Sequence, residues 1–119
     1  MKDRYVFPAT NRLRCSKEYQ DVWARGTRHH TAHFIVLICP NNTDLNRLGI
    51  TVSRKVGNAV CRNQIKRWLR EYFRLHLRDL KVCLDISIVA KRTASKAKHS
   101  DLVQELNSVF ARLETDDHV

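Results

Sequence analysis

The sequence has no long hydrophobic run and no close pair of cysteines. Its longest purely apolar segment, residues 34–39, has six residues, whereas a membrane-spanning helix needs about 20. No stretch resembles a secretory signal peptide. The four cysteines, which would be the ligands of a structural zinc ion or the halves of disulfides, are instead spread along the chain, at Cys15, Cys39, Cys61 and Cys83. We therefore expect a cytoplasmic protein in which Cys39 is simply a small buried side chain.

Acidic residues are scarce relative to basic ones. Twelve Asp and Glu stand against 22 Lys and Arg, which gives a formal net charge of +10 at pH 7. A charge of this size attracts polyanions, so nucleic acid is the expected partner, with an anionic membrane surface as the second possibility. The 43% of hydrophobic residues excludes a disordered tail, and a length of 119 residues predicts a single domain, 1–119.

The few acids do not cluster, which argues against catalysis by the chain itself. A nuclease that cuts RNA alone needs acids that hold metal ions or a His/Lys acid–base pair, and the sequence shows neither. His29, His30 and His33 are close together, but neighbouring strand residues point to opposite faces, and no acid or cysteine is near them in the sequence. We expect no catalytic residue and no metal site in the protein.

The hydrophobic pattern predicts three helices and three strands. The helices are expected over 17–25, which Gly26 ends, over 59–78, and after Ser100, which is expected to cap the last helix. The strands are expected over 34–39, 48–53 and 84–90, the first two as an antiparallel pair. The ends, 1–12 and 114–119, are expected to be flexible. The order α-β-β-α-β-α indicates an α+β fold, a single-domain α-β sandwich.

The central predicted helix has a basic face. Between residues 54 and 78 there are eight basic residues and one acid, Glu71. At 100° per residue five of the cations share one sector opposite the apolar stripe: Lys66, Arg67, Arg70, Arg74 and Arg78. A solvated face normally mixes charges of both signs, because like charges one turn apart repel each other. The row therefore favours a polyanion-binding face over a merely solvated one.

An aromatic pair marks the first predicted helix. Tyr19 and Trp23 lie one turn apart, a spacing that is more often found in a core than in a binding site. The alternative is a surface on which single-stranded bases stack. The sequence pattern alone leaves both interpretations open.

Residues 57–71, GNAVCRNQIKRWLRE, closely resemble the signature of the bacterial ribonuclease P protein component. That signature has an Arg-Asn-Arg core followed by Ile/Leu-Lys-Arg. This chain has Arg62 and Asn63 but Gln64 at the third position, which removes one possible phosphate contact. Further similarity lies in residues 11–14, 48–50 with 54–55, and 90–92, so that the resemblance covers about 11–113.

The resemblance implies a fold and an RNA partner. The fold would be a small mixed sheet with helices packed on it, in which the central helix follows a left-handed βαβ crossover. The partner would be a large catalytic RNA that holds the Mg²⁺ ions and hydrolyses precursor tRNA at the 5′ end of the mature sequence. By this similarity the contacts with the catalytic RNA are expected at Arg62, Asn63, Lys66, Arg67 and Arg70.

The resemblance also implies a cleft for the 5′ leader of precursor tRNA, between the first helix and the sheet. Its aromatic positions match Tyr19 and Trp23, with Phe34 on the adjoining strand. The basic residues around it would be Arg54, Lys55, Lys91 and Arg92. No membrane is expected, and no protein partner is required.

Three other functions remain to be weighed against this one. A ribosomal or RNA-chaperone protein would share the basic helix but need not have an aromatic cleft beside it. A DNA-binding protein that reads bases with residues 59–78 is disfavoured, because that helix is too uniformly cationic and a helix-turn-helix spacing is missing. A self-sufficient nuclease is disfavoured by the missing acid cluster.

Overall fold

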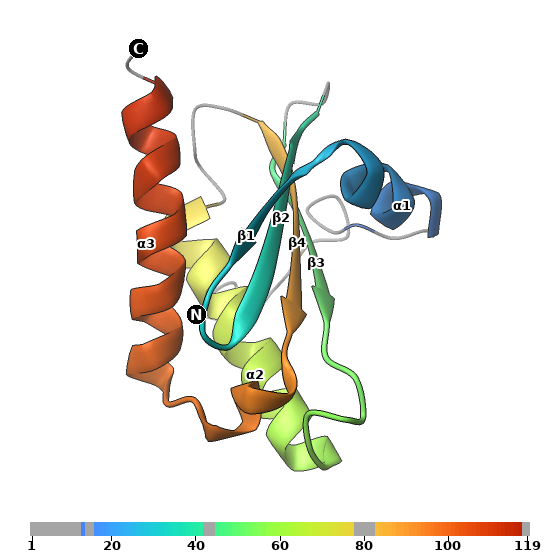
Figure 1. Cartoon of the computed structure of the whole chain (residues 1–119), viewed down its shortest axis with the longest axis vertical. Coiled ribbons are helices and arrows are strands. Elements are labelled where there is room, and N and C mark those ends of the chain that lie inside the picture. Colours follow the sequence, from blue (N-terminus) through green and yellow to red (C-terminus); the bar gives the residue numbers. More distant parts are fainter. Residues whose placement is uncertain (1–12, 14–15, 42–44, 78–82, 118–119) are drawn as a thin grey trace, which may run out of the picture.

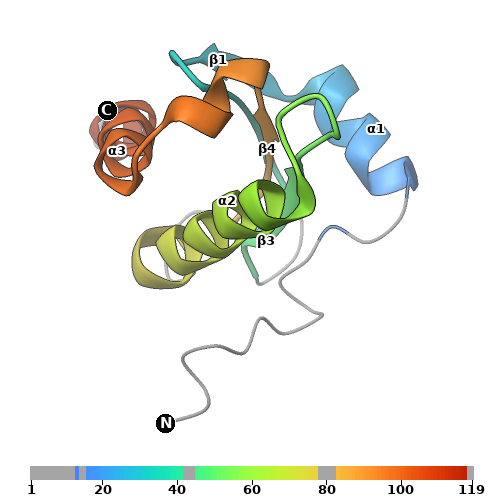
Figure 2. The same ribbon diagram turned by 90° about the horizontal axis from the view of Figure 1, so that it is seen from below.

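A mixed sheet of four strands lies between two layers of helices (Figures 1 and 2). The computed structural model describes residues 13, 16–41, 45–77 and 83–117. In chain order the elements are α1 (Ser16–Arg25), β1 (Thr27–His30), β2 (Phe34–Pro40), β3 (Arg47–Thr51), α2 (Ala59–Tyr72), the π-helical turn η3 (Phe73–Leu77), β4 (Leu84–Ala90), the 3₁₀ helix η4 (Arg92–Lys96) and α3 (His99–Asp117).

The strand order is β1-β2-β4-β3. β4 lies in the middle, antiparallel to β2 and parallel to β3. The expected pairing of β2 with β3 is therefore wrong: these two strands run in opposite directions, but β4 lies between them. β1 was not predicted, because its four residues, Thr-Arg-His-His, are polar and mostly exposed. The order of the main elements is thus α-β-β-β-α-β-α.

The connection from β3 through α2 to β4 is a parallel β-α-β crossover. In Figure 1 both strands run downwards, α2 lies behind the sheet, and β4 is to the left of β3. This arrangement is the left-handed sense, as expected, although about 98% of such crossovers are right-handed. The crossover puts α2 on the face of the sheet that α1 leaves free (Figure 2).

The sheet has a core on each face. α2 and α3 cover the face that carries Val36, Ile38, Ile86 and Ile88, and this is the larger core. α1 covers the other face, where Val22 packs with Leu37 and Cys39 in a smaller core. Since neighbouring strand residues point to opposite faces, β2 and β4 are buried on both sides, and their sequences are apolar almost throughout. Cys39 is buried with its thiol free, as expected.

The ends of the helices differ from expectation in three places. α3 begins at His99 rather than after Ser100, and the carboxylate of Asp101 accepts a hydrogen bond from the backbone N–H of Lys98 at 2.9 Å, as an acid in the first turn often does. α2 becomes a π-helical turn at Phe73. α3 continues to Asp117, so that part of the end expected to be flexible is helical. None of the described helices is both long and apolar enough to cross a membrane.

Candidate nucleic-acid interface

The basic face belongs to α2. Asn58 caps this helix, since its side-chain oxygen accepts a hydrogen bond from the backbone N–H of Cys61 at 2.9 Å. The side facing the sheet is apolar and buried, at Ile65, Leu69 and Tyr72. All five expected contacts with the catalytic RNA lie on this helix: Asn63, Arg67 and Arg70 are exposed, and Arg62 and Lys66 are partly exposed. At 100° per residue Arg62 lies nearest the buried apolar side, and the other four lie further round towards solvent.

Two cations of α2 and the following turn already have a protein partner. Arg62 Nε donates a hydrogen bond to the carbonyl oxygen of Gly57 at 3.2 Å. Arg74 forms an ion pair with Glu71, so the expected row of unrelieved like charges is interrupted there. Arg78 lies outside the described residues. The charges available to a polyanion are therefore concentrated in the second half of α2, at Lys66, Arg67 and Arg70.

Two further basic pairs lie at one end of the sheet. Arg54 and Lys55 follow β3, and Lys91 and Arg92 follow β4. Because β3 and β4 are parallel, their carboxyl ends lie at the same edge of the sheet, at the bottom of Figure 1. η4 packs against α2, and the N-terminus of α2 is at the same end (Figure 2). The fold therefore gathers residues that are far apart in the sequence into one basic end.

The turn between β1 and β2, residues 31–33, is fastened to this end. Lys91 Nζ donates a hydrogen bond to the carbonyl oxygen of Thr31 at 2.6 Å, and the backbone N–H of Lys91 donates one to the carbonyl oxygen of His33 at 2.9 Å. Glu105 of α3 accepts hydrogen bonds from Thr31 Oγ1 at 2.6 Å and from the backbone N–H of His33 at 2.8 Å. The ring of His33 contacts the same carboxylate through Nδ1.

His33 therefore has an acidic partner, although none is near it in the sequence. Glu105 lies 72 residues further along the chain, and only the fold brings the two together. Burial by itself would raise the pKa of Glu105, but the hydrogen bonds from Thr31 and His33 outweigh burial and leave that pKa below its ordinary value of 4.5. The carboxylate is thus the ionised centre that holds the turn.

Tyr19 of α1 is half-buried against β3. A Cβ atom at Gly49 would lie 2.5 Å from a carbon of the Tyr19 ring and 2.7 Å from its hydroxyl oxygen, so the ring fits only because residue 49 has no side chain. Burial raises the pKa of Tyr19, a backbone hydrogen bond with Ile50 acts in the opposite direction, and the charge of Glu18 adds to the rise.

Trp23 lies one turn further along α1 and is 39% exposed. The guanidinium carbon of Arg28 is 4.7 Å from the centroid of its ring. Neither Tyr19 nor Trp23 is sealed in a core. Phe34, by contrast, is fully buried in the larger core, on the face of the sheet opposite α1. The expectation that Phe34 lines the same surface as the two other aromatics is therefore wrong, because its position in β2 points to α2 and α3.

The sheet face beside these rings is only partly covered by α1. The strand register puts four side chains in a row across this face, which we call the open row: His30, Ile35, Val89 and Thr51. His30 and Thr51 are exposed, and Ile35 and Val89 are half-buried and pack against the smaller core. Since Thr51 ends β3 and Val89 is next to the end of β4, the open row lies at the basic end.

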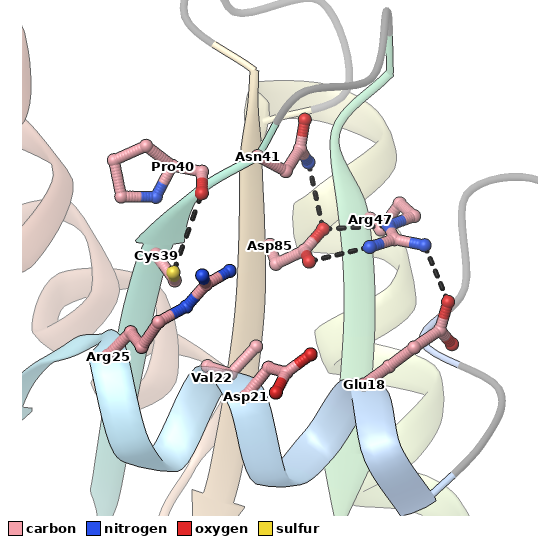
Figure 3. A pocket seen from close by; sticks show the side chains of 9 residues that line it. All are labelled: Glu18, Asp21, Val22, Arg25, Cys39, Pro40, Asn41, Arg47 and Asp85. Atoms are coloured by element: carbon pink, nitrogen blue, oxygen red, sulfur yellow. Dashed lines mark hydrogen bonds and ion pairs between the residues drawn. The ribbon is translucent and has the colours of Figure 1, made fainter.

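The other flank of α1 borders a polar cavity of about 120 Å³ (Figure 3). Its walls include the ion-paired Arg47, whose Nε and Nη2 donate to the two carboxylate oxygens of Asp85, both at 2.7 Å, and whose Nη1 reaches Glu18 at 2.6 Å. Tyr19 and Trp23 do not line this cavity. α1 thus has an acidic flank and an aromatic flank, and only the second faces the open row.

No protein-borne metal site is formed by the residues that the structure describes. Within them, no three His, Cys, Asp or Glu side chains gather closely enough to hold an ion.

Comparison with known proteins gives a consistent result. The family model described as ribonuclease P matches residues 7–114. The ribonuclease P protein component of Syntrophus aciditrophicus is 40% identical over 103 residues, 87% of each chain, and that of Desulfovibrio desulfuricans is 46% identical over 96 residues, 79% of this chain and 74% of the relative.

Solved structures show the same similarity at the level of the fold. The RNase P protein of Staphylococcus aureus superposes with a TM-score of 0.79 at 33% identity and covers 87% of this chain and 94% of its own. That of Thermotoga maritima has a TM-score of 0.74 at 30% identity and covers 85% and 96%. With the family model spanning nearly the whole chain, these relatives establish that the protein belongs to the ribonuclease P protein family.

Proposed function

We propose that this ribonuclease P protein subunit binds the catalytic RNA through α2 and the 5′ leader of precursor tRNA through the aromatic flank of α1 and the open row. In this way it assists the Mg²⁺-dependent removal of the leader. The RNA would hold the Mg²⁺ ions, which activate the attacking water and stabilise the leaving oxygen in phosphodiester hydrolysis. The protein itself contributes binding and positioning.

The α2 part of the proposal is supported by charge and exposure. Arg67 and Arg70 have no acidic partner among the described side chains, and the helix that carries them is fixed by its buried apolar side. A rigid row of cations can neutralise successive phosphates and release their counterions. Gln64 is exposed on the same helix, where the family signature has an arginine, so this chain would make one charged contact fewer there.

The leader part rests on one observation: the open row lies between the aromatic rings and the basic end. Single-stranded RNA is bound by proteins that combine a cationic groove with aromatic and apolar surfaces on which bases stack. Here Tyr19, Trp23, Ile35 and Val89 supply the stacking surface. The cations stand at one end of it, in two pairs from separate strands: Arg54 with Lys55, and Lys91 with Arg92.

Holding the leader in this way would raise activity without any catalytic side chain. A substrate fixed in its reactive geometry reacts faster because the entropy of alignment is lost on binding rather than in the chemical step. Lys91 is already held by Thr31, so its ammonium group is positioned before RNA arrives.

Cleavage of precursor tRNA at low Mg²⁺ tests the function. The purified protein alone should be inactive, a bacterial ribonuclease P RNA alone should be slow, and the two together should be fast. Cleavage by highly purified protein without RNA would contradict the proposal. So would a mixture that is no faster than the RNA alone, which is the result expected of a general RNA-binding protein.

A further inference from the structure

β1 carries an arginine, Arg28, to the aromatic flank of α1. The chain passes directly from α1 into β1 at Gly26, whose N–H donates a hydrogen bond to the carbonyl oxygen of Val22 at 2.8 Å. A Cβ atom at Gly26 would lie 2.4 Å from that oxygen and 3.0 Å from the carbonyl oxygen of Ile38. Because residue 26 has no side chain, the junction can be this tight, and residues 23 and 28 meet although they belong to different elements.

The register of β1 fixes the side on which Arg28 lies. Arg28 is opposite Leu37, which packs under α1, and His30 is opposite Ile35 of the open row. Arg28 therefore belongs to the same face as Tyr19 and Trp23. Its position next to the open row does not follow from the sequence pattern, because β1 has no hydrophobic alternation to reveal it.

The Trp23 ring restrains the Arg28 side chain and leaves its charge available. The guanidinium lies 4.7 Å from the ring centroid, within the range of a cation–π interaction. Arg28 is exposed, and within the described residues no carboxylate pairs with it. A planar guanidinium can donate two parallel hydrogen bonds to a phosphate, and one that is already restrained loses less side-chain entropy when it does so.

We propose that Arg28 binds a phosphate of the single-stranded 5′ leader, beside the bases that contact the open row. This inference rests on the proposed leader site and adds a contact from β1 to it. Arg28 covers part of one face of Trp23, and the part of the ring that is still exposed is available for a base.

Arg25 is a matched control for Arg28. It is also an exposed arginine, three positions earlier, but it lines the polar cavity with Glu18 and Asp21 on the other flank of α1. Replacing either arginine with alanine removes one positive charge from nearly the same part of the molecule. A change in the general electrostatic field therefore affects both variants alike, whereas a leader contact affects only one.

The experiment measures dissociation constants of the reconstituted holoenzyme for a precursor tRNA and for the same tRNA without its leader. For R28A we expect about a tenfold loss of precursor affinity, the effect of one hydrogen bond to a charged group. The log–log salt slope should fall by about 0.7, and affinity for mature tRNA should be unchanged. R28K should recover part of the loss, and R25A should keep the wild-type ratio of the two affinities.

Four results would overturn the inference. Equal losses in R28A and R25A would mean that only the overall charge matters. A loss of affinity for the ribonuclease P RNA itself, with the precursor-to-mature ratio intact, would place Arg28 at the RNA subunit instead. If the wild-type holoenzyme shows no preference for precursor tRNA, both the proposed leader site and this inference are wrong. If the wild type shows the preference and R28A keeps it unchanged, only this inference is wrong.

Discussion

At the scale of single residues, two glycines determine where the aromatic flank of α1 lies. Gly26 permits the close junction with β1, and Gly49 leaves room for the Tyr19 ring on β3. At both positions a Cβ atom would lie closer to neighbouring atoms than van der Waals contact allows, and neither glycine has a positive φ angle. Their role is therefore to leave space for other atoms, and it does not depend on a backbone conformation reserved for glycine.

Gly49→Ala tests this account of Tyr19. The added Cβ would force the ring away from β3, and overpacking of this kind costs about 1–3 kcal/mol of unfolding free energy. In the double variant G49A/Y19A the ring is absent, so the cost of the alanine at residue 49 should largely disappear. Urea unfolding of the two single variants and the double variant measures this coupling; strictly additive losses would show that the Tyr19 ring does not depend on Gly49.

Glu105 should make stability depend on pH in acid. Its folded-state pKa lies below its ordinary value of 4.5, so its contribution is fully present above 4.5 and is lost as the pH falls through the lower, folded value. Glu105→Gln should cost about 1–3 kcal/mol at neutral pH and should flatten that acid limb. Unfolding midpoints across a pH series check this, with Gln104→Ala on the same helix as the control. An unchanged acid limb would show that another carboxylate is responsible.

At the scale of elements, α2 separates its structural side from its binding side, so the two can be changed independently. Charge reversal at Arg67 and Arg70 leaves Ile65, Leu69 and Tyr72 in place. We expect the variants to fold normally but to bind the ribonuclease P RNA more weakly. The log–log salt slope should be lower by about 0.7–0.9 for each lost phosphate contact. Filter binding over a range of salt concentrations measures both effects, and an unchanged slope would mean that this face is only solvated.

The elements also show which parts of the fold the sequence could predict. α1, β2 and β4 have hydrophobic periods that match their secondary structure, and each lies within one residue of its expected bounds. α2 begins where it is expected, but its α-helical part ends at Tyr72 and a π-helical turn follows. β1 could not be found, because an exposed edge strand of polar residues has no such period. The pairing of β3 with β4 depends on a crossover of more than thirty residues, so the short turn before β3 suggested the wrong neighbour.

At the scale of the whole molecule, the candidate site is assembled from residues that only the fold brings together. The basic face of α2 was predictable, because helical geometry alone defines it. Three other features were not, since each needs the sheet register or a distant partner: the burial of Phe34 away from α1, the ion pair between His33 and Glu105, and the placement of Arg28 over Trp23. The family resemblance suggested the proposed leader site in outline, and the strand register excludes Phe34 from the face that α1 covers.

The most direct test of the central claim is the ratio of precursor to mature tRNA affinity, measured for ribonuclease P RNA with and without the protein. We predict that the protein raises this ratio, because it contacts the leader and mature tRNA has none. In W23A the ratio should fall, because the free energy of precursor binding loses roughly 1–3 kcal/mol with one stacking contact. The Tm should change little, because Trp23 is only partly buried. If the protein raises both affinities equally, or if W23A unfolds the protein and leaves the ratio unaltered, the leader does not bind beside α1.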